Sequence, residues 1–242
     1  MIINPFRFAS GGAGDDGFPI IASLWARYKA SDIAIADGDP ISTWVDKSGN
    51  SRDATQGTSA MRPIYRPVAS DLVGNTAAVE FGGTAGSPHL FEMPSMASLS
   101  ACEGFAFIRT YTTGHYKVWQ MGGGSNDSYY FYGGSLKTYE DFGRVSSRMN
   151  NIDSGYDYAD WNLYSVSAKP GEWILRWNNV VRATYTTGTF GLPSVPVIGG
   201  KTATSYPVAN TQVAEYVFFS DVLSSGDRAA VYDYFQSEYL GI

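Results

Sequence analysis

Short apolar runs separated by turn residues dominate this chain, and this pattern leaves few folds open to it. From residue 20 onward, glycine, proline, asparagine and aspartate interrupt the apolar or alternating runs every few residues. Such spacing is typical of an antiparallel sandwich. We therefore expect an all-β protein in which two antiparallel sheets pack face to face. The expected strands lie at residues 20–28, 41–45, 77–81, 90–93, 104–111, 116–121, 128–132, 161–168, 172–177, 180–186, 195–199 and 212–219.

The clearest strand order is in the second half of the chain. Residues 161–168, 172–177 and 180–186 are separated only by short turns, which predicts a three-stranded meander. The second turn is Asn178-Asn179, and asparagine tolerates the positive φ of a tight hairpin. Within the middle strand, alternation places one apolar set on a single packed face: Trp173, Leu175 and Trp177.

One helix is expected, close to the C-terminus. Ser224 precedes Asp227 by three residues, and this pair can satisfy the free N–H groups of a helix start. Gly241 predicts the end of the helix. Between them, an apolar stripe repeats at helical spacing and would lie against the sandwich: Ala230, Val231, Tyr234, Phe235 and Tyr239.

Two segments resemble a known family. Residues 44–54 read WVDKSGNSRDA, and residues 214–219 read AEYVFF directly before the expected helix. Together they resemble the signatures of the concanavalin A-like lectin and glucanase superfamily, in the laminin-G-like form found in phage and bacterial proteins. The resemblance covers nearly all of the chain after about residue 20. It implies a jelly-roll sandwich with one short C-terminal helix, and it leaves the function open, because such sandwiches serve as lectins, hydrolases, adhesins and structural modules.

The first 19 residues differ from the rest. We expect residues 20–242 to form the sandwich and residues 1–19 to form an anchoring arm with a Gly-rich linker. A loose tail is the alternative, since chain ends are often poorly ordered. The arm is favoured by four apolar residues in a short segment: Ile2, Ile3, Phe6 and Phe8.

Composition limits the partners and the location. Charged residues make up 17% of the chain and the formal net charge is −6, so the basic stripe that nucleic acids require is not expected. The single cysteine, Cys102, cannot form an internal disulfide, and we expect it to be buried. No apolar run suits a membrane span, and the N-terminus lacks the features of a signal peptide. Assembly in a host cytoplasm followed by lysis, as for phage particles, would fit these features.

Catalysis is not expected. Glycoside hydrolysis needs two carboxylates around the sugar bond. Hydrolytic relatives carry their acids alternately along one strand, whereas Glu140 and Asp141 are adjacent and would point to opposite faces of a strand. Glu172 and Glu215 stand singly. The two histidines, His89 and His115, lie in loop-like settings without metal-ligand spacing and are expected to have loop or capping roles.

The loop after Trp44 has two interpretations. Oxygen ligands from Asp46, Asn50 and Asp53 could hold a calcium ion at the rim of the sandwich. The same side chains could instead cap the backbone N–H groups of their own loop, which is the interpretation we favour. No cofactor is expected to be required.

Sugar binding would use aromatic faces framed by carboxylate and amide side chains. Two segments offer this mixture, although Tyr-rich loops also mark protein interfaces. The first contributes Asn126, Asp127, Tyr129 and Tyr130. The second, which interrupts the regular sandwich and is the stronger candidate, contributes Asp153, Tyr156, Asp157, Tyr158 and Trp161.

These features together suggest a non-enzymatic phage virion surface protein, in the head or the tail, that displays a lectin-like domain. Its expected partners are other virion proteins, bound through the arm, and host-surface glycans, and self-association is compatible with the sequence. A stand-alone carbohydrate-binding module is the first alternative, and a glycoside hydrolase is the second.

Overall fold

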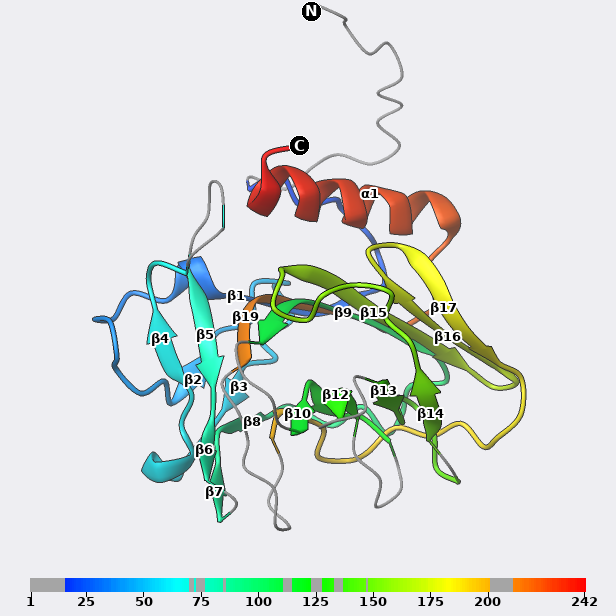
Figure 1. The fold of residues 1–242 in the computed structure, drawn as a ribbon, viewed down its shortest axis with the longest axis horizontal. Helices are drawn as coiled ribbons and strands as arrows, with labels where there is room; N and C mark the ends of the chain where they lie inside the picture. The colour runs from blue at the N-terminus through cyan, green and yellow to red at the C-terminus, as the bar shows by residue number, and fades with distance from the viewer. Residues whose placement is uncertain are drawn as a thin grey trace, which may run out of the picture.

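A computed structural model describes residues 16–69, 72, 77–84, 86–110, 115–122, 128–132, 137–146, 148–200 and 211–242. These residues form two facing β-layers with a single α-helix lying across the outer face of one layer (Figure 1). The expected all-β sandwich with one C-terminal helix is therefore confirmed. No helix in these ranges is long and apolar enough to cross a membrane.

The larger layer is an antiparallel sheet of eight strands. Its order is β17-β16-β15-β9-β19-β5-β4, and β1 also pairs with β19. The strands are β1 (Leu24–Lys29), β4 (Ile64–Arg66), β5 (Ala78–Phe81), β9 (Cys102–Thr110), β15 (Asn162–Lys169), β16 (Glu172–Trp177), β17 (Val180–Tyr185) and β19 (Thr211–Phe219).

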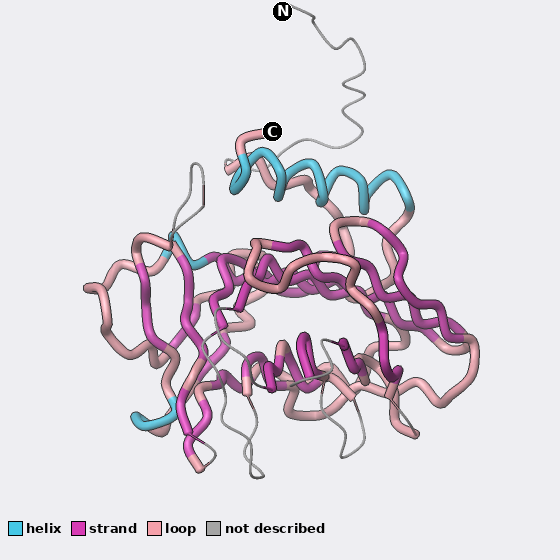
Figure 2. The backbone as a smooth tube through the Cα atoms, in the orientation of Figure 1, coloured by secondary structure: helices cyan, strands magenta, loops and turns pink. Residues whose placement is uncertain are grey.

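The facing layer is built from two smaller sheets (Figure 2). One has the order β11 (Trp119–Gln120), β18 (Val197–Gly199), β8 (Leu90–Glu92), β3 (Ala54–Thr55) and β2 (Thr43–Trp44). The other has the order β10 (His115–Lys117), β12 (Tyr129–Tyr132), β13 (Lys137–Glu140) and β14 (Met149–Ile152). The connections between these strands also contain a small hairpin and two 3₁₀ turns. The hairpin is formed by β6 (Gly83–Thr84) and β7 (Ser87–Pro88), and the 3₁₀ turns are Ala30–Asp32 and Ser59–Met61.

The predicted meander is confirmed. Strands β15, β16 and β17 pair in sequence order, and both asparagines of the second turn have positive φ, 47° at Asn178 and 63° at Asn179. The aromatic face of β16 is buried between the two layers, as alternation predicts. This core between the layers is rich in large aromatic side chains: Trp44, Trp119, Trp173, Trp177, Tyr164 and Tyr216.

Strand β19 is buried on both faces. Val213, Tyr216 and Phe218 belong to the core between the layers, whereas Val217 and Phe219 belong to a second core beneath the helix. Burial on both sides explains why this segment is almost continuously apolar instead of alternating.

Helix α1 (Ser225–Phe235) covers the second core and continues through one wider turn, Gln236–Leu240. The Ser224 hydroxyl accepts a hydrogen bond from the Asp227 N–H (3.1 Å), which confirms the predicted cap. Gly241 ends the helix in the left-handed conformation, with φ 67°. The buried residues of the helix are Val231, Tyr234, Phe235 and Tyr239, four of the five predicted for its apolar stripe.

Two buried carboxylates fasten the helix to the sheet. A bulge in β19 brings Glu215 to the helix side, where the Tyr239 hydroxyl (2.6 Å) and the Tyr234 hydroxyl (3.0 Å) donate to Oε2 and Arg27 Nε donates to Oε1 (2.5 Å). At the other end, Glu103 of β9 accepts two hydrogen bonds from Arg228. A buried, hydrogen-bonded ion pair fixes one docking geometry, so the helix has a defined position over the sheet.

Other expectations have mixed outcomes. Cys102 is buried, as predicted, and burial raises the pKa of its thiol. His89 accepts a hydrogen bond from the Gly82 N–H (3.3 Å) in a connection between strands, whereas the backbone of His115 lies in β10 and not in a loop.

The packed chain begins before the expected boundary at residue 20, because Phe18 is buried against Tyr234 and Asp16 pairs with Arg27 (2.6 Å). The proposed arm residues Ile2, Ile3, Phe6 and Phe8 lie outside the described residues.

Candidate functional site

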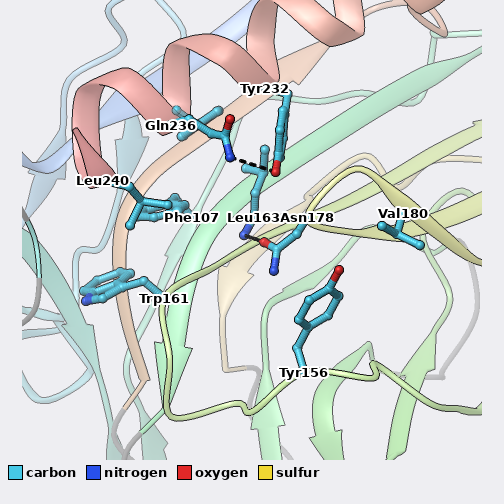
Figure 3. A pocket seen from close by; sticks show the side chains of 10 residues that line it. Phe107, Tyr156, Trp161, Leu163, Asn178, Val180, Tyr232, Gln236 and Leu240 are labelled. Atoms are coloured by element: carbon cyan, nitrogen blue, oxygen red, sulfur yellow. Dashed lines mark hydrogen bonds between the residues drawn. The ribbon is translucent and has the colours of Figure 1, made fainter. Parts of the chain in front are cut away.

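A cleft of about 410 Å³ opens between the helix and the outer face of the eight-stranded sheet (Figure 3). The sheet supplies its floor, the helix its upper wall, and the loop between β14 and β15 its lower wall. Its volume is within the range of about 300–1,000 Å³ that is usual for small-ligand sites. The lining residues are Phe107, Tyr156, Trp161, Leu163, Asn178, Val180, Tyr232, Phe235, Gln236 and Leu240.

Two half-buried tyrosines face each other across the cleft. Tyr232 points down from the helix and Tyr156 points up from the loop below (Figure 3). Gln236 Nε2 donates to the Tyr232 hydroxyl (2.9 Å). Burial, together with the nearby Tyr156, raises the pKa of Tyr232, so its hydroxyl keeps its proton at neutral pH and can donate a hydrogen bond.

Trp161 forms one end of the cleft. Its indole stacks on Phe107 of β9, with centroids 5.4 Å apart and an interplanar angle of 12°, and it is only 7% exposed. Trp161 therefore presents only an edge of its indole ring to a ligand, whereas Tyr156 and Tyr232 present more of their rings.

The β16–β17 turn contributes a fixed amide. Asn178 Oδ1 accepts from the Leu163 N–H (2.8 Å), and Asn178 Nδ2 donates to Asn162 Oδ1 (2.8 Å). This side chain holds the turn against β15 and so fixes the floor of the cleft. Among the described residues, no carboxylate lines the cleft, so its polar side chains are those of tyrosine, tryptophan, asparagine and glutamine.

The loop segment predicted from the sequence divides between the cleft, the core and the solvent. Tyr156 and Trp161 line the cleft. Tyr158 does not, because it is 8% exposed and packs between the layers against Tyr130 (5.3 Å) and Trp177 (5.1 Å). Tyr158 is therefore buried away from the cleft, and its sugar-stacking role stays a prediction.

The two acidic residues predicted as glycan ligands in this loop shape its backbone. Asp153 accepts from the Gly155 N–H (3.1 Å) and pairs with Lys137 (2.7 Å), and the Lys137 hydrogen bond lowers the pKa of Asp153. Asp157 accepts from the Ala159 N–H (2.9 Å). Neither side chain lines the cleft.

The described residues of the first predicted segment do not line the cleft. Tyr130 is fully buried in the core, where Trp177 covers it at 4.5 Å, and Tyr129 is 8% exposed on β12. Both rings are largely buried and lie outside the cleft, and the glycan role of Tyr129 and Tyr130 stays a prediction. Asn126 and Asp127 lie outside the described residues.

Sequence reasoning missed Asn178, Tyr232 and Gln236. The helical stripe identified the buried face of α1, and Tyr232 and Gln236 lie at the edge of that face, where side chains border the cleft. The signal available in the sequence was that two polar side chains four residues apart lie on one side of a helix.

In the loop after Trp44, Asp46 caps backbone groups. Its carboxylate accepts from the N–H groups of Arg27 (2.9 Å), Ser48 (2.8 Å) and Arg52 (3.0 Å), and from the Ser48 hydroxyl (2.7 Å). These donors surround both oxygens of Asp46, which is the geometry of a capped loop.

The other two residues suggested for calcium also form hydrogen bonds with the backbone. Asp53 accepts from the Asp46 N–H (2.9 Å), and Asn50 Nδ2 donates to the Leu24 carbonyl (2.9 Å). Within the ranges that the structure describes, no three histidine, cysteine, aspartate or glutamate side chains gather as a metal site. Calcium binding stays a prediction for a chelator experiment to test.

The acidic pair Glu140 and Asp141 behaves differently from expectation. Glu140 is the last residue of β13, and Asp141 follows the strand, so both carboxylates turn toward the Ser128 hydroxyl instead of to opposite faces. Tyr164 and Trp119 also donate to Glu140. Burial raises the pKa of Glu140, and both carboxylates lie inside the sandwich, away from the cleft.

Comparison with known proteins identifies the fold only. No protein-family model matches the chain, and no curated protein matches it by sequence. A sialidase from Trypanosoma rangeli is similar in structure, with 12% identity and a TM-score of 0.59 over 95% of this chain and 36% of the sialidase. The chain thus spans about a third of the length of that enzyme.

Two further structures are similar. Domain 4 of the GH43 extracellular arabinanase AbnA from Geobacillus stearothermophilus, solved in complex with arabinotriose, has 14% identity and a TM-score of 0.60 over 88% of this chain and 98% of that domain. The binding domain of botulinum neurotoxin serotype D has 12% identity and a TM-score of 0.54 over 87% of this chain and 51% of that chain. All three share the β-sandwich fold with this protein.

Proposed function

We propose that this protein binds glycans in the cleft between the helix and the eight-stranded sheet. The observation that carries the proposal is the lining: two half-exposed tyrosines, an indole edge and two amide side chains around one opening. Aromatic faces suit the apolar faces of sugar rings, and paired donors and acceptors suit their hydroxyl groups.

The structural neighbours support this proposal by analogy. The arabinanase domain matches this chain over 98% of the domain's own length, and it was solved with an oligosaccharide. Shared fold alone does not transfer a ligand, so the support for glycan binding comes from the lining of the cleft itself.

We further propose binding without cleavage. Glycoside hydrolysis requires two carboxylates beside the scissile bond, and none of the described residues that line the cleft is acidic. Product analysis of any bound oligosaccharide after prolonged incubation tests this point, and release of shorter sugars would contradict it.

The direct test is a glycan-array screen of the full chain, followed by titration of the best ligand, with calcium and again with a chelator. The variant Tyr156→Ala removes one wall of the cleft and should abolish array binding. Its matched control is Tyr139→Ala, because Tyr139 is a half-buried tyrosine of the facing layer that lines no part of the cleft. Equal binding by wild type and Tyr156→Ala would reject this site.

A virion surface role is the setting that we propose for this activity. It is supported by the apolar residues near the N-terminus and by the phage-type signatures of the sequence. Deletion of residues 1–15, which keeps the Asp16–Arg27 pair, should leave the sandwich folded and abolish incorporation into a particle or oligomer. Unchanged incorporation would favour a stand-alone carbohydrate-binding module.

A further inference from the structure

A groove of about 550 Å³ lies where the described part of the chain begins. The segment leading into β1 supplies one side of the groove, and the turn at Asp32 and the loop after Trp44 supply the other. Its apolar lining residues are Phe18, Pro19, Ile20, Ile21, Ala22 and Leu24. The groove and the cleft have no lining residue in common, so they are separate openings.

The apolar side of the groove is open to solvent. Phe18 is buried, but Ile20 is 66% exposed and Ala22 is also exposed. Pro19 and Ile21 are half-buried. Contact with another apolar group would remove this surface from water, which is favourable. A contiguous open apolar surface of this kind is typical of a docking site.

The polar side of the groove is acidic at its surface. The partly exposed carboxylates of Asp16 and Asp32 both line it. Lys47 pairs with Asp32 (3.5 Å) and is also partly exposed. Arg27 is only 4% exposed, and it pairs with both Asp16 and the buried Glu215. Two carboxylates and one ammonium group of the lining therefore reach the solvent, which favours a partner that carries a positive charge.

The sequence places a segment with this chemistry directly before the groove. Residues 1–15 lie outside the described residues. Arg7 is the only charged side chain among the first 14 residues. Four apolar residues accompany it: Ile2, Ile3, Phe6 and Phe8. The segment 2–8 thus combines apolar side chains with one positive charge, which suits the two sides of the groove.

The connection to the sandwich is long enough for this segment to turn back onto the groove. Residues 9–15 separate it from Asp16, which itself lines the groove. A connection of this length spans roughly 25 Å when extended, and it is rich in glycine. A short Gly-rich tether gives its two ends an effective concentration in the millimolar range. The segment of the same molecule is therefore favoured over that of a second copy at ordinary protein concentrations.

We propose that residues 2–8 dock in the groove of their own molecule, with their apolar side chains on residues 19–24 and Arg7 beside Asp32. This proposal goes beyond glycan binding, because the groove and the cleft are separate. It gives the apolar segment a binding surface in the isolated protein. Anchoring to a particle would then require the segment to leave the groove.

Trypsin cleavage after Arg7 measures docking in the full chain. A docked segment is cleaved only when it leaves the groove, so the rate reports the equilibrium between docked and free segment. Ile20→Asp introduces a charge from an exposed position and should speed the release of residues 1–7 by about tenfold or more. Val195→Asp is the matched control and should be cleaved as the wild type is, because Val195 is 53% exposed and lines neither groove nor cleft. Equal rates for wild type and Ile20→Asp would overturn the proposal.

A second variant tests whether the segment and the groove share a contact. Ile3→Ser removes an apolar group of the segment at a distance from the cleaved bond and should also speed cleavage. The combination with Ile20→Asp should be cleaved no faster than Ile20→Asp alone, because both changes disrupt the same contact. If the two effects multiplied, the residues would act independently and the proposed docking would be wrong.

Dilution distinguishes the groove of the same molecule from that of a second copy. We expect the ratio of cleavage rates between Ile20→Asp and wild type to be the same at ~1 and ~100 µM protein. Resistance to trypsin that appears only at the higher concentration would place the segment on a second copy and overturn docking within one molecule. Glycan titrations of the same variants should be unaltered, so failure of this proposal leaves the proposed glycan binding in place.

Discussion

The guanidinium of Arg182 lies 4.9 Å from the centroid of the Tyr156 ring. Arg182 comes from β17, and Tyr156 comes from the loop between β14 and β15, so this contact ties the lower wall of the cleft to the edge of the large sheet. The Ser154 hydroxyl holds the same loop, because it donates to the Tyr156 carbonyl (2.8 Å) and accepts from the Tyr156 N–H (3.1 Å). A tyrosine held in place before binding loses little conformational freedom when a ligand arrives.

The first prediction concerns this positioning contact. Replacing Arg182 by methionine keeps most of the side-chain volume and removes the cation–π attraction, worth about 0.5–1 kcal/mol at a partly exposed site. We expect Arg182→Met to weaken glycan binding about two- to fivefold in calorimetric titration. We expect the fold of this variant to be unchanged, and circular dichroism would check this.

The matched control is Arg148→Met. Arg148 lies 4.6 Å from the centroid of the Tyr139 ring, in an equivalent contact on the facing layer. This variant removes the same kind of interaction away from the cleft and should bind as the wild type does. If both variants lost affinity equally, the role assigned to Arg182 would be wrong.

The second prediction concerns the attachment of the helix. Glu215→Gln leaves the buried Arg27 with Asp16 as its remaining carboxylate partner, and Asp16 is partly exposed. Removal of one member of a buried ion pair costs about 3–5 kcal/mol, and we expect the free energy of unfolding in urea to fall toward that amount. Glu172→Gln is the control, because Glu172 forms an exposed pair with Lys169 and such pairs contribute within about 1 kcal/mol. Equal effects of the two changes would argue against a structural role of the Glu215 cluster.

The third prediction concerns the pH dependence of stability. Burial raises the pKa of Glu140, against the opposing effect of its hydrogen bonds from Ser128 and Tyr164. A carboxyl with a raised pKa binds its proton more tightly in the folded state, so its stabilising contribution is complete below the ordinary value of 4.5 and is lost as the pH rises through the folded value. We expect the difference in unfolding free energy between wild type and Glu140→Gln to fall as the pH rises across that window.

Urea unfolding at a series of pH values from ~4 to ~8 covers this window. Tyr164→Phe is the matched control, because it removes a hydrogen-bond donor to Glu140 and keeps the carboxyl, so the slope should remain. A difference that increases with pH would mean that the pKa of Glu140 is lowered in the folded protein.

Strands β15, β16 and β17 and the helix were predictable because their signals are local. The turn at Asn178 and the cap at Ser224 each depend on a few adjacent residues. Strands β13 and β14 were missed, because they are short and polar, and their pairing in the sheet determines their structure more than their own composition does.

The candidate site was only half predictable for a related reason. Tyr156 and Tyr158 differ by two positions in one loop, yet one borders the cleft and the other is buried in the core. Composition marked the loop as rich in aromatic residues, and it could not distinguish these two environments. Tyr232 reaches the same cleft from a helix far along the chain, and the docking of that helix through Glu215 is a tertiary feature without a local signal.

The last prediction separates backbone strain from crowding at the site. Gly155 and Gly171 both have positive φ, 70° and 79°, which favours glycine. A Cβ at Gly155 would meet the Arg182 guanidinium at 2.7–2.8 Å, whereas a Cβ at Gly171 would meet nothing within 4 Å. We therefore expect Gly155→Ala and Gly171→Ala each to lower the free energy of unfolding by about 1 kcal/mol. Only Gly155→Ala should also weaken glycan binding, because it displaces Arg182 from the Tyr156 ring. Unfolding in urea and titration of the same two variants would check this, and unaltered binding by Gly155→Ala would show that the Arg182–Tyr156 contact does not position the wall of the cleft.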